Sequence, residues 1–188
     1  MRVIAGKYRG RNLKSPPSLE VRPTSDRLRE TLFNVIAPRI GETRFLDLCA
    51  GSGAIGIEAL SRGAAHVTFV DRSRKMCGLV EANLDLCKVP EEETEVVQAE
   101  ASDFLTRSVA TKTQPWDIVF FDPPYANDYH KVLTSLGAHS QKLLSPDGIV
   151  IVEHHHKKDL ADTEGELVRS RTLRQGDSAL SFYVREGG

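Results

Sequence analysis

Hydrophobic residues form short, nearly continuous runs along the chain, separated by longer stretches in which apolar positions repeat with a helical period. Such runs are typical of buried strands, and the stretches between them are typical of amphipathic helices. The alternation up to residue 153 therefore predicts an α/β fold with a parallel, doubly wound sheet. The predicted strands lie at 44–48, 66–70, 95–99 and 116–121, with a fifth ending at 153, and the predicted helices lie near 54–62, 73–87, 102–109 and 128–139.

The two ends of the chain show other patterns. Residues 2–5 and 11–13 predict two short strands around a glycine-containing turn, and so a small N-terminal β-hairpin. Apolar residues on one face predict a helix over about 25–37, with a proline following it. The apolar stretches 167–172 and 179–184 predict a C-terminal hairpin.

Charge is unevenly distributed, although the net charge is only -1. Residues 1–44 carry ten Lys and Arg against four Asp and Glu, whereas residues 45–188 carry 15 against 22. A basic arm on an acidic body suggests contact with the phosphates of a nucleic acid, although a solvated charged surface has the same composition. We therefore divide the chain into a basic arm at 1–22, expected to contact nucleic-acid phosphates, and a main domain at 23–188.

Length and composition restrict the remaining classes. A chain of 188 residues without internal repeats suits one full core. No apolar stretch approaches the ~20 residues of a membrane span, and the basic start lacks a signal-peptide core, so we expect a cytoplasmic protein. Cys49, Cys77 and Cys87 lack CxxC spacing, which argues against disulfides and structural zinc. The run 154–156 of three histidines is not expected to bind metal, because alternate side chains on a strand point to opposite faces and two lysines follow.

A glycine-rich turn follows the strand predicted at 44–48. Gly51 and Gly53 let the backbone approach a ligand closely, and Gly56 lets the next helix pack tightly on a strand. This spacing alone also fits a dinucleotide site. Asp71 ends the next strand, where a carboxylate can accept hydrogen bonds from two ribose hydroxyls. A cofactor is therefore expected at the edge where the carboxyl ends of the parallel strands meet.

The segment Asp122-Pro123-Pro124-Tyr125 directly follows the apolar run 116–121. The carboxylate of Asp122 and the carbonyl of Pro123 can accept two hydrogen bonds from an amino group, which positions its nitrogen and disperses the positive charge that develops during attack. The two prolines hold that carbonyl in a rigid turn. Tyr125 offers a ring on which an unstacked base can lie. A simple loop after a buried strand is the alternative for these four residues alone.

Together these motifs resemble those of the bacterial 16S rRNA (guanine-966-N2)-methyltransferase family, which belongs to the class I S-adenosylmethionine-dependent enzymes. The resemblance implies a Rossmann-like, seven-stranded, mostly parallel sheet with helices on both faces. It implies S-adenosyl-L-methionine as the cofactor and 16S rRNA as the substrate, within the 30S subunit or its late assembly intermediate. We expect a monomer. The matching segments span nearly the whole chain and lie at 2–6, 9–11, 22–27, 29–34, 47–53, 122–125, 176–177 and 180–183.

The resemblance also assigns roles to single residues. It implies that Asp47 helps to hold the methionine end of the cofactor and that Glu100 and Ala101 lie beside its adenine, with Asp103 capping the next helix. Cys49 and Glu100 depart from the family, which more usually has an aromatic residue and Asp there. The expected cofactor-binding residues are Arg22, Thr24, Asp47, Gly51, Ser52, Gly53, Asp71, Glu100, Ala101 and Asp122; the expected catalytic residues are Asp122, Pro123, Pro124 and Tyr125; and the expected RNA contacts are Arg2, Lys7, Arg9, Arg11 and Lys14.

Three other functions are compatible with part of this pattern. DNA adenine-N6 or cytosine-N4 and protein glutamine-N5 methyltransferases share the amino-presenting motif, but the chain has no inserted target-recognition domain, and the glutamine enzymes commonly have Asn at the position of Asp122. A nicotinamide oxidoreductase fits the glycines and leaves Tyr125 and the prolines unexplained. A non-catalytic RNA-binding or ribosome-assembly factor would keep its cellular effect after Asp122→Ala.

Overall fold

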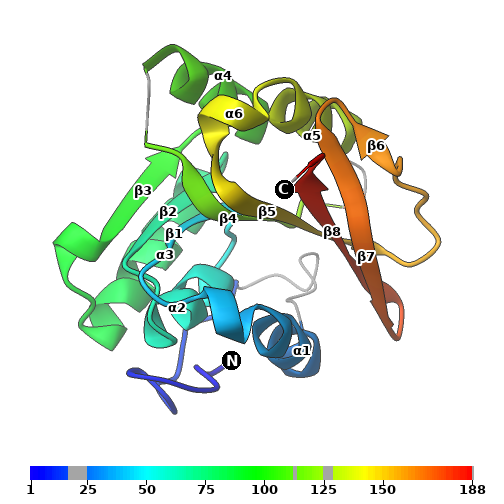
Figure 1. Cartoon of the computed structure of the whole chain (residues 1–188). Helices are drawn as coiled ribbons and strands as arrows, with labels where there is room; N and C mark the ends of the chain where they lie inside the picture. Colours follow the sequence, from blue (N-terminus) through cyan, green and yellow to red (C-terminus); the bar gives the residue numbers. More distant parts are fainter. Residues whose placement is uncertain (17–24, 112–113, 125–128, 188) are drawn as a thin grey trace. The chain divides into compact units, whose positions relative to one another are not determined.

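The computed structural model describes residues 1–16, 25–111, 114–124 and 129–187. The chain divides into two compact units, a first unit of residues 1–99 and a second unit of residues 100–188. Each unit combines helices with neighbouring strands (Figure 1).

Three parallel strands form the sheet of the first unit, in the order β3-β2-β1. Parallel neighbours need a crossover connection, and here each crossover contains a helix. The elements are β1 (Arg44–Leu48), α2 (Ala54–Ser61), β2 (His66–Asp71), α3 (Arg74–Cys87), the short 3-10 helix η2 (Glu91–Glu93) and β3 (Thr94–Gln98).

Helix α1 (Asp26–Ile36) precedes this sheet. Its N-terminus is capped by Ser25, whose hydroxyl accepts a hydrogen bond from the N–H of Leu28. The 3-10 helix η1 (Ala37–Arg39), which contains Pro38, follows directly. The helix predicted at 25–37 is therefore confirmed to within one residue at each end.

Within its described residues, 1–16, the N-terminal arm reverses direction but contains no strand of more than one residue pair. Its residues 1–16 hold a single antiparallel bridge, between Arg2 and Asn12. Two backbone bonds support the reversal, from Val3 N to Arg11 O at 3.0 Å and from Gly10 N to Val3 O at 2.9 Å. The predicted hairpin is thus reduced to one bridge, and the boundary predicted between residues 22 and 23 lies outside the described residues.

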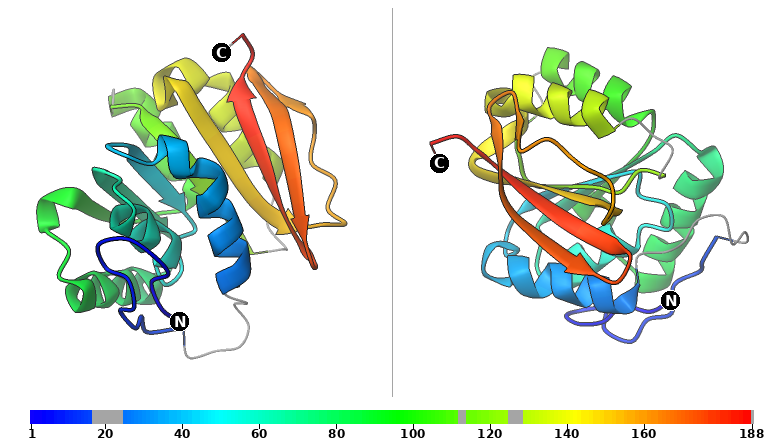
Figure 2. Two further views of the ribbon diagram at one scale, coloured as in Figure 1. Left: turned by 60° about the horizontal axis from the view of Figure 1, so that its bottom comes forward. Right: turned by 90° about the vertical axis from the view of Figure 1, so that its right-hand side faces the viewer.

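The second unit contributes five strands in the order β4-β5-β8-β7-β6. Strands β5, β8 and β7 lie side by side in the left view of Figure 2. Strand β5 pairs in parallel with β4 and antiparallel with β8, so this part of the sheet is mixed. The predicted C-terminal hairpin is confirmed as β7 and β8, whereas β6 is an eighth strand beyond the seven expected. The elements are α4 (Ala101–Thr111), β4 (Trp116–Phe121), α5 (Tyr129–Ala138), α6 (Ser140–Leu143), β5 (Leu144–His155), β6 (Thr163–Glu164), β7 (Leu167–Gln175) and β8 (Ser178–Arg185).

Aromatic residues fill the core of the second unit. Trp116 and Phe120 are each only 1% exposed, as expected for side chains that enter a buried strand. The ring of Trp116 packs on Phe104 of α4 at 5.7 Å between centroids. Among the described residues, no helix is long and apolar enough to cross a membrane.

Close packing of α2 against β2 fixes the helix that follows the glycine-rich turn. A Cβ atom added to Gly56 would lie 2.2 Å from Cε1 of Phe69 and 2.8 Å from Cγ1 of Val67. All eight residues of α2 are buried, so the helix has little room to move away. The predicted role of Gly56 in tight helix packing is therefore confirmed.

Replacing Gly56 with alanine is expected to destabilise the protein by about 1–3 kcal/mol, because the added methyl group overlaps a buried ring that cannot withdraw. Gly78→Ala is the matched control, since a Cβ at this α3 position meets no atom within 4 Å. In a helix that change should stabilise by up to about 1 kcal/mol. Urea unfolding of both variants measures the difference, and equal free energies of unfolding would contradict the packing argument.

Candidate functional site

The glycine turn (residues 49–53) joins β1 to α2 through a sharply bent backbone. Cys49, Gly51 and Gly53 all have positive φ, at 65°, 57° and 76°. A positive φ is unusual for a residue with a side chain such as Cys49. Backbone strain of this kind is common at binding sites. The Cys49 thiol is half-buried.

The carboxylate of Asp71 ties the end of β2 to this turn. Its Oδ2 accepts a hydrogen bond from the N–H of Gly51 at 2.9 Å, and its Oδ1 accepts one from the N–H of Ser73 at 2.8 Å. Each oxygen keeps a further lone pair, so a bound diol can still donate to it. Asp71 and the turn therefore lie together, as the sequence predicts. Asp71 also stabilises the backbone of the turn through its bond to Gly51.

Asp47 lies beneath the turn and is 2% exposed. Its Oδ2 accepts a hydrogen bond from the N–H of Gly56 at 3.0 Å, in the first turn of α2. Burial raises the pKa of Asp47 to about 7; the Gly56 N–H opposes this rise, and the nearby charge of Asp71 adds to it. A cationic ligand at the turn would favour the ionised form of Asp47.

Helix α2 also anchors the arm. The buried carboxylate of Glu58 accepts hydrogen bonds from the N–H groups of Ile4 at 2.7 Å and Ala5 at 3.0 Å. Ser61 accepts from the N–H of Tyr8 through its hydroxyl and from the N–H of Lys7 through its carbonyl. Sequence reasoning missed this docking, because nothing in the pattern of a helix predicts partners more than fifty residues away.

Asn83 of α3 links the arm to the glycine turn and is fully buried. Its Oδ1 accepts from the N–H of Lys14 at 2.8 Å, while its Nδ2 donates to the carbonyls of Lys14 at 3.1 Å and Ser52 at 2.9 Å. One amide therefore bonds to both segments. The only sequence signal for it is a polar residue on the buried face of a predicted helix.

The second unit carries the other predicted site residues. Asp122 follows the last residue of β4 and is half-buried, Pro123 is buried, and Pro124 is exposed. Glu100 is exposed and Ala101 is the first, buried residue of α4. Asp103 lies in the first turn of α4 and does not cap it, because the helix begins at Ala101, two residues before Asp103. The predicted residues Arg22, Thr24 and Tyr125 lie outside the described residues.

The three histidines at the end of β5 do not alternate as a regular strand would. His154 is buried and bonds through Nε2 to the Ser181 hydroxyl at 2.9 Å. The rings of His155 and His156 stack at 4.6 Å between centroids, because β5 ends at His155. Ligand atoms of these two residues and Asp177 lie within 4.8 Å of one another. The geometric reason given against a metal is therefore wrong, while the expectation of no metal stays a prediction.

Comparisons with known proteins find relatives that match nearly the whole chain. A family model described as Conserved hypothetical protein 95 matches residues 1–184. Ribosomal RNA small subunit methyltransferase D of Escherichia coli K12 is 37% identical over 186 residues, 99% of this chain and 90% of the relative. The protein of that name from Haemophilus influenzae is 37% identical over 174 residues, 92% and 88% of the two chains. The solved structure of the Escherichia coli protein yhhF matches with a TM-score of 0.84 and 35% identity, covering 100% of this chain and 99% of that one.

Asp47→Asn is expected to change how stability depends on pH. Asp47 holds a proton up to about pH 7 in the folded protein but loses it near 3.8 in the unfolded chain, so the folded state binds more protons between these values. Wild-type stability should therefore fall from pH 4 to 7 and then level off, by at most about 4 kcal/mol from this group. Asparagine cannot ionise and can still accept from Gly56. The free energy of unfolding of the variant relative to wild type should rise over this window, and a pH-independent difference would contradict the burial effect.

Asn83→Ala is expected to destabilise the protein by about 2–3 kcal/mol, because it removes a buried amide and the three part-buried hydrogen bonds that it makes to the backbone of Lys14 and Ser52. Hydrogen exchange of the Lys14 amide should accelerate, while the Ile4 amide held by Glu58 should change less. Asn12→Ala removes an exposed amide from the arm and should stay within about 0.5 kcal/mol of wild type. Equal exchange rates for Lys14 in wild type and Asn83→Ala would show that this link does not hold the arm.

Proposed function

The chain belongs to the family described as Conserved hypothetical protein 95, and we propose that it transfers a methyl group from S-adenosyl-L-methionine to the N2 amine of guanine 966 in 16S rRNA. The acceptor is the small ribosomal subunit or its late assembly intermediate, and the enzyme acts as a cytoplasmic monomer. Similarity to two ribosomal RNA small subunit methyltransferases D over most of the chain supports the substrate class.

The observation that carries the proposal is the glycine turn held between two carboxylates. A Cβ atom added to Gly51 meets no atom within 4 Å, so the positive φ of this residue is not explained by packing and leaves open space beside the backbone. Asp71 borders the turn directly, and Asp47 lies under it. A cofactor with a diol and a cationic methionine end suits this set of groups, since carboxylates accept from hydroxyls and attract cations.

When bound, the cofactor supplies an electrophilic methyl group. Asp47, Asp71 and the residues 51–53 of the turn would hold it, with Arg22, Thr24, Glu100 and Ala101 as further proposed contacts. The chain must then position a weakly nucleophilic amine. Asp122 and the carbonyl of Pro123 would accept hydrogen bonds from its two N–H groups, which would orient the nitrogen lone pair for attack and stabilise the positive charge that develops. Tyr125 is proposed to stack on the guanine, and Pro124 to restrict the turn.

The arm supplies the affinity for RNA in this proposal. A hairpin loop presents a curved, densely charged backbone, and the base of a loop nucleotide is easier to unstack than one in a duplex. Five basic residues of the arm are the proposed phosphate contacts: Arg2, Lys7, Arg9, Arg11 and Lys14. Docking on α2 and α3 holds the arm in place before RNA binds, which lowers the entropic cost of binding.

Asp122→Asn is expected to lower methyl transfer about a hundredfold or more, because the amide cannot accept and neutralise charge as the carboxylate does. The assay uses methyl-labelled S-adenosylmethionine and small subunits from cells that lack this guanine modification, with the label located by nuclease digestion and mass spectrometry. Binding of small subunits should persist in the variant. Asp159→Asn, an exposed change in the same unit, should match wild type.

Label in N2-methylguanosine at the predicted loop supports both reaction and substrate. If wild type binds the cofactor but leaves small subunits unlabelled, the rRNA assignment fails, and DNA and protein acceptors would be tested with the same assay. Full activity of Asp122→Asn would remove the carboxylate from the mechanism while leaving the substrate assignment intact.

A further inference from the structure

A cleft of about 300 Å³ lies in the first unit between the arm and the start of α1. This volume is at the lower end of the range for ligand pockets, about 300–1,000 Å³. Three arginines and two acids stand among its walls. The cleft is lined by Arg2, Val3, Ile4, Arg9, Gly10, Asp26, Arg27 and Glu30.

Arg29 holds the two walls of this cleft together. Its Nη2 donates to the carbonyl of Arg2 on the arm at 2.7 Å and to the carboxylate of Asp26 on α1 at 2.8 Å. The Arg29 side chain is fully buried, so it serves as a fixed internal clamp. Because Asp26 is paired with it, Glu30 is the one lining acid that is not neutralised in this way.

Four charged side chains that line the cleft are not paired within the described part of the protein. Among the described residues, no hydrogen bond or ion pair engages the side chains of Arg2, Arg9, Arg27 or Glu30, all of which are exposed. Three arginines around one small cleft would repel one another if nothing bound there. Such a set is suited to an anion, since a guanidinium offers paired donors to phosphate oxygens.

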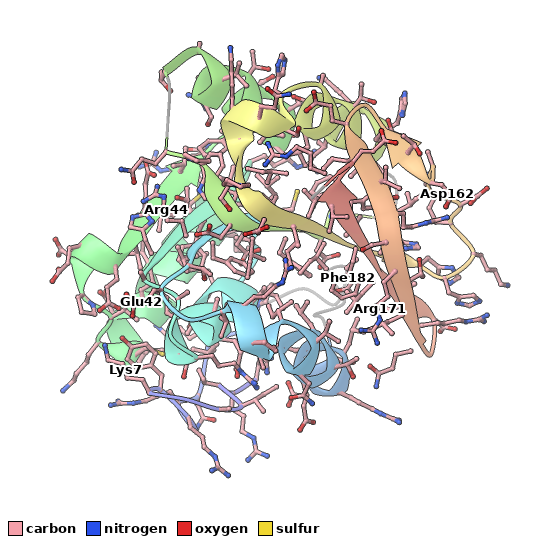
Figure 3. All side chains as sticks on the ribbon, in the orientation of Figure 1. Lys7, Glu42, Arg44, Asp162, Arg171 and Phe182 are labelled. Atoms are coloured by element: carbon pink, nitrogen blue, oxygen red, sulfur yellow. The ribbon has the colours of Figure 1, made fainter. Side chains whose placement is uncertain are left out.

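The remaining cations of the arm face a different part of the unit. Lys7 is labelled in Figure 3. Its Nζ lies 3.6 Å from Glu93 of η2, and Arg11 donates to the carbonyl of Leu86 near the end of α3. Lys14 is held through its backbone by Asn83 of α3. The arm therefore has one edge that pairs with α3 and η2, and a second edge whose arginines meet α1.

We propose that the cleft between the arm and α1 binds a phosphate of the single-stranded RNA that carries the target guanine, through Arg2, Arg9 and Arg27. This inference rests on the proposed function and adds a residue of the main domain, Arg27, to the RNA-binding surface. The size of the cleft suits one phosphate with its sugar rather than the side of a duplex. Because the Arg29 clamp fixes both walls, the site is formed before RNA arrives. Glu30 repels the phosphate and limits the affinity.

Arg9→Ala and Arg27→Ala, made in the full-length protein, should each raise KM for unmodified small subunits about three- to tenfold, with kcat at saturation and the cofactor Kd unchanged. The slope of log affinity against log salt should fall by about 0.7 for each lost phosphate contact. Glu30→Gln should act in the opposite direction and lower KM about two- to threefold, because it removes a like charge. A gain of affinity cannot arise from misfolding.

Arg39→Ala is the matched control, since Arg39 lies beyond the other end of the same helix, roughly 18 Å from Arg27 at 1.5 Å per residue. Its KM should stay within twofold of wild type. If wild type labels small subunits but both cleft arginines can be removed without a change in KM, the cleft is not an RNA site. A KM for Glu30→Gln equal to or above that of wild type also overturns it. Absence of methyl transfer by wild type is the separate failure of the proposed function.

Discussion

Contact between Gly56 and the ring of Phe69 fixes helix α2, and three features of the first unit depend on the position of that helix. Its first residues continue the glycine turn, and the N–H of Gly56 is held by Asp47. Its middle residue Glu58 binds the arm through two backbone amides. Its last residue Ser61 binds the arm again, so closely that a side chain at Gly6 would overlap the Ser61 carbonyl. One buried helix of eight residues therefore sets the position of both the glycine turn and the arm.

Three carboxylates around this helix have different roles because their burial and their hydrogen-bond partners differ. Glu58 is buried but accepts from two backbone amides and from Nε of Arg62, so its charge is fully compensated. Asp71 is partly exposed and binds two amides, which leaves lone pairs for a ligand. Asp47 is buried with a single amide and therefore retains a raised pKa. The under-compensated carboxylate is the one nearest the proposed methionine end of a cationic cofactor, where binding energy can be gained by restoring its charge.

The sequence predicted the strands and long helices because hydrophobic period is a local property of the chain. It predicted that Gly51, Asp71 and Asp122 lie at or just after the carboxyl ends of strands, and the structure places them there. Parallel sheets bind ligands at these strand ends. It could not predict Asn83 or Glu58 as anchors of the arm, since their partners lie 69 and about 54 residues away. Strand β6 was not predicted, because a strand of two residues is too short to show an alternation of apolar and polar positions. Tyr8, which lies in the basic arm, is only 5% exposed because the arm folds back on α2. The burial of such residues depends on contacts between segments far apart in the chain, which a single sequence does not reveal.

The arm and the glycine turn are joined by more than a shared scaffold. Asn83 makes two hydrogen bonds to Lys14 and one to Ser52, so a movement of the arm's end away from α3 would release the side chain that also holds the turn. A buried amide left without partners costs about 1–3 kcal/mol. An RNA strand that binds on the α1 edge of the arm would leave these bonds intact. A strand that displaced the arm from α3 would instead disturb the glycine turn. The placement of the free arginines on the α1 edge therefore allows RNA and cofactor to bind together, as methyl transfer between them requires.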